Sequence, residues 1–200
     1  PFLISVEVAD SKTNQPFAFT AIINHFKSYR GIDDEKDGDR VRQKRRLEAE
    51  WLANFVVQRQ TANPAERLIL CGDFNAFQFN DGYNDLIGIL KGSPNPNVLA
   101  PSKDVYPTGL INLIDFIEPA KRYSYIFGGT AQALDHILIN KAVQARALKF
   151  GYARLDADFP DVYRNDANRP ERLSDHDAPI FYMSLDEIPQ PKPAAATAKP

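Results

Sequence analysis

Three short segments of this chain gather carboxylates, an amide and imidazoles beside apolar, strand-like runs. They are Gly-Asp-Phe-Asn at residues 72–75, Leu-Asp-His at 134–136 and Ser-Asp-His at 174–176. The chain has three histidines, His25, His136 and His176, and each lies in or beside such a run. The pattern predicts polar groups at the ends of several strands, where they could meet in one site.

This set of groups suits the hydrolysis of a phosphodiester. The reaction needs a polarised phosphorus, an activated water and stabilisation of the leaving oxygen, and Mg²⁺ or Mn²⁺ can supply much of the first and third. Mg²⁺ prefers oxygen ligands and keeps several waters, so one or two carboxylates suffice to hold it. A histidine beside the phosphate can donate a proton, and a carboxylate behind that histidine favours its imidazolium form.

The elements that must position these groups alternate between strands and helices. Apolar runs predict strands at 2–8, 17–26, 68–71, 148–155 and 178–185. Residues 122–127 and 134–140 are expected to form a hairpin across Gly128 and Gly129. Two helices are predicted at about 40–60 and 83–90, and a short one after Thr108.

The helix at 40–60 carries large apolar residues at helical spacing. Asp39 is its predicted N-cap. Its buried stripe is predicted to consist of Leu47, Trp51 and Phe55, joined by Leu52 and Val56.

Size and composition limit the classes of protein that fit. The 200 residues suffice for one domain with a core, and 44% hydrophobic with 25% charged residues is ordinary for a globular protein. No apolar stretch reaches the length of a membrane span. The single cysteine, Cys71, excludes an internal disulfide framework and a cysteine-rich zinc site. A net charge of −2 means that nucleic acid would have to bind through local basic patches or through a metal.

Together with Asn-His-Phe-Lys-Ser at 24–28, the three segments follow the order of motifs in a known superfamily. The chain resembles the endonuclease/exonuclease/phosphatase (DNase I-like) superfamily, which includes nucleases, abasic-site endonucleases, sphingomyelinases and inositol polyphosphate phosphatases. The run at 24–28 and Tyr-Ser-Tyr-Ile-Phe at 123–127 most resemble bacterial extracellular nucleases. The resemblance spans residues 1 to about 185. It implies an α/β (α+β) fold, a four-layer sandwich of two mostly antiparallel sheets flanked by helices, here incomplete at the N-terminus.

The resemblance also implies catalytic roles. His176 would lie over the scissile phosphate, oriented by Asp135 in a dyad. Asp73 and Asn75 would position the attacking water and the phosphate. His25 would be the second histidine in contact with the phosphate.

The implied cofactor is Mg²⁺ (or Mn²⁺), with Asp175 and Asp73 as ligands. The principal metal-binding glutamate of the superfamily is expected on a strand before Pro1, because residues 1–3 resemble the segment that follows it. Residues 1–187 are therefore expected to be the C-terminal portion of a catalytic domain. The N-terminal half of that domain is expected to be a separate segment that packs against it as a partner. Residues 188–200 are expected to be a Pro/Ala-rich linker or tail. Alone, the chain is expected to be inactive or weakly active.

Several other residues have a structural and a functional interpretation. His136 alternates with Asp135 along a strand, so the two should face opposite sides and a buried structural role is favoured for His136. The basic run at 40–46 is expected to be a partly solvated helix face rather than a phosphate site. Lys27 is the better candidate for a phosphate contact, and Tyr123 is a candidate substrate-binding residue.

The predicted function is metal-dependent phosphodiester hydrolysis by a nuclease that acts on DNA rather than RNA and is exported, either secreted or periplasmic. The first alternative is a phosphatase or sphingomyelinase-type phosphoesterase of the same superfamily. The second is a non-catalytic fragment or interaction module. The catalytic residues are shared among the enzymes of the superfamily, so they leave the substrate open.

Overall fold

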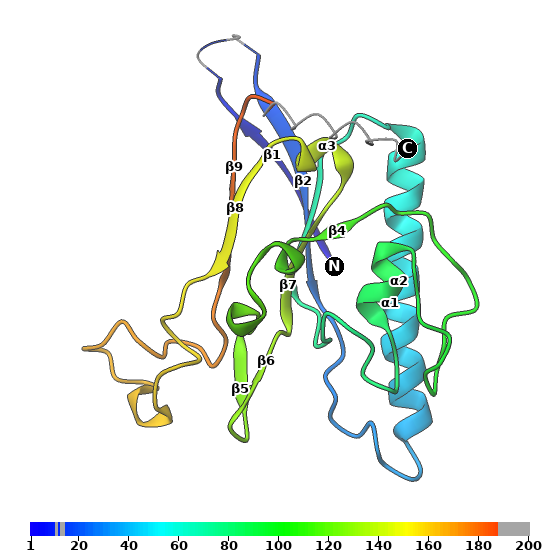
Figure 1. Cartoon of the computed structure of the whole chain (residues 1–200), viewed down its shortest axis with the longest axis vertical. Helices are drawn as coiled ribbons and strands as arrows, with labels where there is room; N and C mark the ends of the chain where they lie inside the picture. The colour runs from blue at the N-terminus through cyan, green and yellow to red at the C-terminus, as the bar shows by residue number, and fades with distance from the viewer. Residues whose placement is uncertain (11, 13–14, 188–200) are drawn as a thin grey trace, which may run out of the picture.

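The centre of the fold is a five-stranded sheet in the order β1-β2-β3-β7-β4 (Figure 1). The computed structural model describes residues 1–10, 12 and 15–187, and the tail predicted at 188–200 lies outside that range. The sheet contains Phe2–Val8 (β1), Phe17–His25 (β2), Leu68–Asp73 (β3), Ile111–Asn112 (β4) and Asp135–Ile139 (β7). Strands β2 and β3 are parallel, and the other neighbouring pairs are antiparallel.

Two small antiparallel sheets and several helices surround this central sheet. The small sheets pair Tyr125–Phe127 (β5) with Thr130–Gln132 (β6), and Ala147–Tyr152 (β8) with Pro179–Met183 (β9). The α-helices are Gly38–Ala62 (α1), Leu86–Lys91 (α2) and Lys141–Gln144 (α3). Three 3-10 turns complete the described elements: Leu113–Phe116 (η1), Pro119–Lys121 (η2) and Asp161–Tyr163 (η3).

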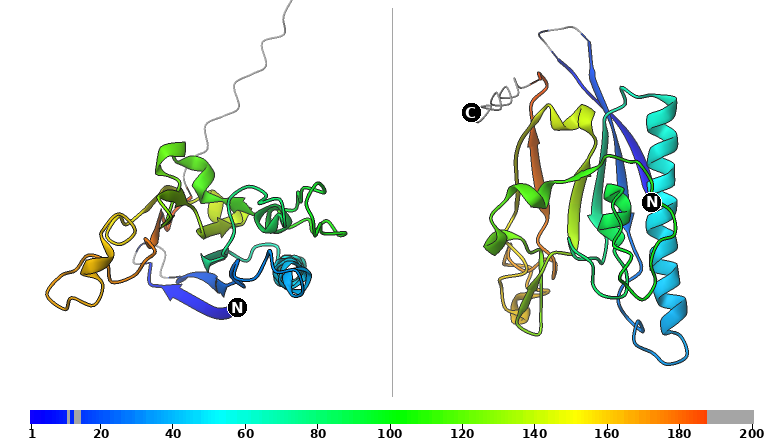
Figure 2. Two further views of the ribbon diagram at one scale, coloured as in Figure 1. Left: turned by 90° about the horizontal axis from the view of Figure 1, so that it is seen from below. Right: turned by 45° about the vertical axis from the view of Figure 1, so that its right-hand side comes forward.

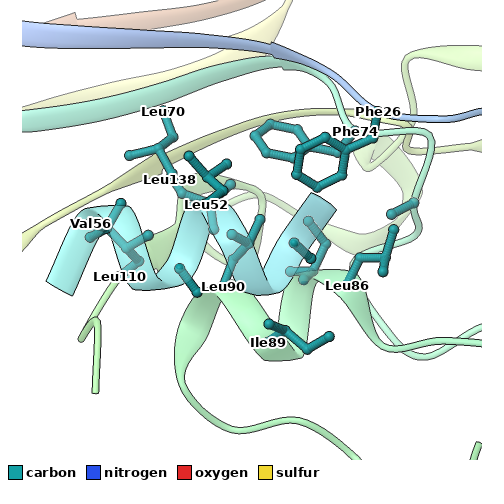
Figure 3. Packing of buried hydrophobic residues seen from close by; sticks show 14 of the residues in the cluster. Phe26, Leu52, Val56, Leu70, Phe74, Leu86, Ile89, Leu90, Leu110 and Leu138 are labelled. Atoms are coloured by element: carbon teal, nitrogen blue, oxygen red, sulfur yellow. The ribbon is translucent and has the colours of Figure 1, made fainter. Parts of the chain in front are cut away.

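The two faces of the central sheet pack against different layers because strand side chains alternate. Leu70 and Leu138 point into a core shared with α1 and α2 (Figure 3). Their neighbours Ile69 and Ile137 point the other way, into a core that includes Phe150 of β8. Figure 2 shows the central sheet between the helices and the β8–β9 sheet. The predicted α+β class, with mostly antiparallel sheets and helices outside, is confirmed.

The predicted hairpin is wrong in its second strand. The turn at Gly128 and Gly129 is correct, but β5 pairs with β6 rather than with residues 134–140. Strand β7 instead lies between β3 and β4 in the central sheet. All five residues of β7 are buried, which suits a strand covered on both faces and not the arm of an exposed hairpin.

The predicted buried stripe of α1 is also partly wrong. Leu47 and Trp51 are 53% and 54% exposed, while Leu52 and Val56 are buried as predicted. The buried face continues through small residues, Ala49 and Ala53, which let the helix approach the sheet closely. The helix begins at Gly38, with Asp37 rather than Asp39 at the N-cap position. Within the described part of the chain, no helix is long and apolar enough to cross a membrane.

Candidate active site

The register of the central sheet aligns three predicted site residues in one row. His25 is opposite Asp73 in the β2–β3 pair, and Asp73 is opposite Asp135 in the β3–β7 pair. Since paired residues point to the same face, the three side chains lie side by side across three strand ends. The His25 Nε2 atom is 3.6 Å from Asp73 Oδ2, and the His25 side chain is largely exposed.

His176 joins this row through a direct contact with Asp135. Its Nδ1 donates a hydrogen bond of 2.6 Å to Asp135 Oδ2. Burial lowers the pKa of His176, but the hydrogen bond and charge of Asp135, with the charges of Asp73 and Asp175, outweigh it and raise that pKa overall. The predicted dyad is therefore formed, and it favours the imidazolium form of His176.

A buried serine that the sequence analysis missed supports the dyad. Ser124 Oγ donates a 2.7 Å hydrogen bond to Asp135 Oδ2 and accepts bonds of 3.1 Å from the backbone amides of Leu134 and Asp135. It thereby fixes the carboxylate that orients His176. In the sequence, only the alternation along residues 123–127, which directs Ser124 toward the protein interior, indicated that this serine is buried.

Asp73 and Asn75 form a second hydrogen-bonded unit at the end of β3. The backbone amide of Asn75 donates to Asp73 Oδ1 at 2.7 Å, and its Nδ2 donates to Asp73 Oδ2 and to the Phe26 carbonyl, both at 3.0 Å. Asn75 has a left-handed φ of 46°, which asparagine tolerates better than most residues. Burial is the main cause of a raised pKa at Asp73.

Only glycine fits at position 72, just before this unit. Gly72 has a φ of +131°, and a Cβ atom there would lie 2.0 Å from the backbone oxygen of Asn24. The close approach of β2 and β3 at this point holds His25 beside Asp73. The glycine of the Gly-Asp-Phe-Asn segment is thus required by packing and by backbone conformation.

The acidic groups of the site fit a hard cation. Single ligand atoms of Asp73, Asp135 and His176 lie within 4.8 Å of one another. Asp135 Oδ2 accepts from both His176 and Ser124, while its Oδ1 accepts from no other described residue. Asp175 makes no hydrogen bond or ion pair to any other described residue, yet its charge acts on His176. Asp73 and Asp135 therefore bring together carboxylate oxygens of the kind that Mg²⁺ or Mn²⁺ prefers. The predicted ligand Asp175 is outside this group of described residues.

Comparison with known proteins identifies a family. A model of the Endonuclease/Exonuclease/phosphatase family matches residues 13–176. The chain belongs to that family. A search of curated proteins finds no match.

Two solved structures have a similar fold at low sequence identity. Humanized D. rerio TDP2 with 14 mutations is 16% identical, with a TM-score of 0.52 over 91% of this chain and 60% of that one. Truncated Caenorhabditis elegans TDP2 is 13% identical, with a TM-score of 0.52 over 90% of this chain and 63% of that one. The chain thus spans roughly three-fifths of the length of these two relatives.

Arg45, in the basic run, joins the two loops that follow β2 and β3. Arg45 is fully buried. Its Nη1 donates to the Lys27 carbonyl at 2.6 Å, and its Nη2 donates to the Asn75 carbonyl at 2.8 Å and lies 3.3 Å from Asp81. Arg45 lies one turn before Ala49 on the buried face of α1. This spacing could have predicted that Arg45 is buried while the neighbouring basic residues are solvated.

Lys27 and Tyr123, the two predicted substrate contacts, have intramolecular partners. Lys27 Nζ donates to the carbonyls of Ser28 and Arg30, at 3.0 and 3.1 Å. The Tyr123 hydroxyl donates to Asp158, and the Arg154 guanidinium lies 3.5 Å from its ring centroid. Neither side chain forms a hydrogen bond or ion pair with His25, Asp73 or Asp135.

His136 has the structural role that strand alternation predicts. It is fully buried, its Nε2 donates to the Ala76 carbonyl at 2.7 Å, and its Nδ1 accepts from Asn112 Nδ2 at 3.0 Å. Burial lowers its pKa and keeps the ring neutral. In the Leu-Asp-His segment the histidine therefore packs in the core, while the aspartate contacts His176.

A second buried aspartate, Asp177, anchors the Ser-Asp-His segment. Its Oδ2 accepts from Arg154 Nη1 at 2.8 Å, and its Oδ1 accepts from the amides of Asp156 and Ala157 at 2.9 and 3.1 Å. These bonds fix the chain one residue after His176. No spacing in the sequence distinguishes Asp177 from an exposed aspartate, so it could not have been predicted.

Proposed function

We propose that the intact protein is a divalent-metal-dependent phosphodiesterase and that DNA is its substrate. The observation that carries this proposal is the Asp135–His176 pair beside Asp73, at the ends of neighbouring strands. The resemblance of residues 24–28 and 123–127 to extracellular nucleases favours DNA over a phospholipid or an inositol phosphate.

In this mechanism His176 acts on the phosphate oxygens. With Nδ1 bonded to Asp135, the imidazolium has Nε2–H to donate to a phosphate oxygen as negative charge develops there. Asp73 accepts a hydrogen bond from the attacking water and aligns it with phosphorus. Asn75 keeps the Asp73 carboxylate in one orientation.

Asp73 and Asp175 would hold Mg²⁺ or Mn²⁺ in this enzyme. When bound, the ion would polarise the phosphate and stabilise the leaving oxygen. We also propose that the intact protein adds a glutamate ligand from outside these 200 residues. The proposal is supported by the motif resemblance of residues 1–3 and 24–28.

The test compares three substrates with the intact protein: plasmid DNA, sphingomyelin vesicles and an inositol polyphosphate. DNA cleavage that needs Mg²⁺ and stops with a chelator is expected. His176→Ala should lower kcat by at least about 100-fold, the scale of general acid catalysis. Lys103→Ala, an exposed residue outside the site, is the matched control and should leave the rate unchanged.

Two results would refute this function. One is chelator-resistant cleavage that survives His176→Ala. The other is hydrolysis of the lipid or the inositol phosphate with no cleavage of DNA, which would move the protein to the phosphatase or sphingomyelinase type.

A further inference from the structure

A cavity of about 650 Å³ opens next to the candidate active site. One wall comes from the segments that follow β2 and β3 and includes Tyr29 and Phe77. The other wall comes from the β5–β6 hairpin and includes Tyr125, Phe127 and Gln132. We call this space the aromatic cleft. Its size is typical of a site for a small organic ligand.

The aromatic cleft adjoins the catalytic groups through two of its lining residues, Asn75 and Tyr125. Asn75, which holds Asp73, lines its inner end. The Tyr125 ring stacks on the His176 imidazole, with centroids 4.6 Å apart and planes at 30°, and the two residues also form an isolated β-bridge. A group attached to a phosphate beside His176 would therefore enter the cleft directly.

The rings of the two walls are arranged in stacked pairs. Tyr125 and Phe127 lie 6.3 Å apart at 18°, and Tyr29 and Phe77 lie 5.6 Å apart at 29°. Phe127 is 64% exposed, so a flat ligand could cover one of its faces. Apolar rings gathered at the mouth of a cleft are typical of a binding surface rather than a solvated one.

The wall that contains Tyr29 is rigid before any ligand binds. The Tyr29 hydroxyl donates a 2.7 Å hydrogen bond to Asp81, and the Arg45 guanidinium lies 4.0 Å from the ring centroid. Arg45 is fully buried and bonded to backbone carbonyls. A ligand would therefore lose little free energy in ordering this wall.

We propose that the aromatic cleft binds an unpaired nucleobase adjacent to the scissile phosphate, so that the enzyme prefers single-stranded DNA to an intact duplex. The inference rests on the proposed function and adds the substrate class to it. Each base has two π faces that stack on aromatic side chains regardless of sequence. In a duplex the neighbouring bases cover those faces, and unstacking has a cost. The Gln132 amide, which lines the cleft, offers a polar partner for a base edge, and an acyl chain could not use it.

Phe127→Ala in the intact protein tests this proposal. The substrates are a single-stranded oligonucleotide, the duplex of the same sequence, and an oligomer of abasic deoxyribose phosphates. The expected result is a KM for the single strand raised about 5- to 150-fold, the range for loss of one base–aromatic stack, with kcat unchanged. The KM for the abasic oligomer should stay the same. Phe127→Trp should restore single-strand affinity.

The matched control is Phe116→Ala, because Phe116 is also 64% exposed and lies in η1, outside the cleft. Equal losses in the two variants would overturn the proposal, and so would wild-type cleavage of duplex at the single-strand rate. Loss of sphingomyelin vesicle binding in Phe127→Ala, with single-strand binding intact, would assign the cleft to a lipid.

Binding separates this proposal from the proposed function. Fluorescence anisotropy of the labelled single strand, measured with a chelator present, reports on the cleft without any hydrolysis. If the wild type cleaves no phosphodiester but binds the single strand, and Phe127→Ala weakens that binding, then the proposed function fails and the cleft stands. Cleavage with no effect of Phe127→Ala on either KM or binding refutes the cleft alone.

Discussion

Replacing Arg45 with methionine keeps a long unbranched side chain on α1 but removes its guanidinium. Arg45 is fully buried, and its partner Asp81 has a side chain that is 5% exposed. The substitution leaves the Asp81 charge buried and removes the donors to the carbonyls of Lys27 and Asn75. Breaking a buried ion pair from one side costs about 3–5 kcal/mol. We expect the lower end, because Tyr29 and two backbone amides still donate to Asp81.

Arg40→Met is the matched control for this prediction, since it removes the same group from the same basic run. Arg40 pairs with Asp37 at 3.1 Å, but the two side chains are 74% and 61% exposed. Such a surface pair contributes about 0–1 kcal/mol. Urea unfolding of the intact protein, followed by circular dichroism, measures both changes in the free energy of unfolding.

A double variant sharpens the test. Asp81→Asn removes the charge that Arg45→Met leaves uncompensated, so the double variant should lose less stability than the sum of the single variants. Equal losses in Arg45→Met and Arg40→Met, or simple additivity with Asp81→Asn, would refute the argument that Arg45 holds the site through a buried pair.

Three further predictions follow from the site. Gly72→Ala should destabilise the protein by about 2 kcal/mol or more, measured by thermal unfolding. The reason is that the alanine Cβ would clash with the Asn24 backbone oxygen, at a φ that disfavours alanine. A loss of stability under half that size would contradict the packing argument. The contribution of neutral His136 to the free energy of unfolding should be complete above its unfolded pKa, about 6.5, and should fall as the pH drops below it, because its folded pKa is lowered. The difference between wild type and His136→Gln, measured from pH 8 to 5, should therefore shrink, and a constant difference would contradict it. Asp175→Asn should raise the Mg²⁺ concentration needed for half-maximal cleavage by about 10-fold while leaving thermal stability unchanged, and an unchanged metal requirement would exclude Asp175 as a ligand.

Local patterns predicted the elements and the residue types of the site. Apolar runs located the strands that end at His25 and Asp73, and alternation along a strand assigned His136 to the core. These predictions succeeded because burial with a period of two is a property of each strand by itself. The motif order was also sufficient to identify the family.

Side-chain partners far apart in the chain could not be predicted in the same way. Leu47 and Trp51 lie at helical spacing, and so do the residues of the face that is buried. Helical spacing therefore fits both faces of α1, and only the position of the sheet decides which face is buried. Strand β7 could have paired with the hairpin, but its burial on both faces stabilises it at the centre of the sheet.

The sequence by itself determined which groups could act on a phosphodiester and at which strand ends they lie. Only the tertiary structure decided that Ser124 fixes Asp135, that Arg45 is buried beneath the site, and that two aromatic walls face each other beside His176. The physical reason is that hydrogen bonding and stacking act over a few ångströms in space, and the residues that meet there are separated by up to about a hundred positions in the chain.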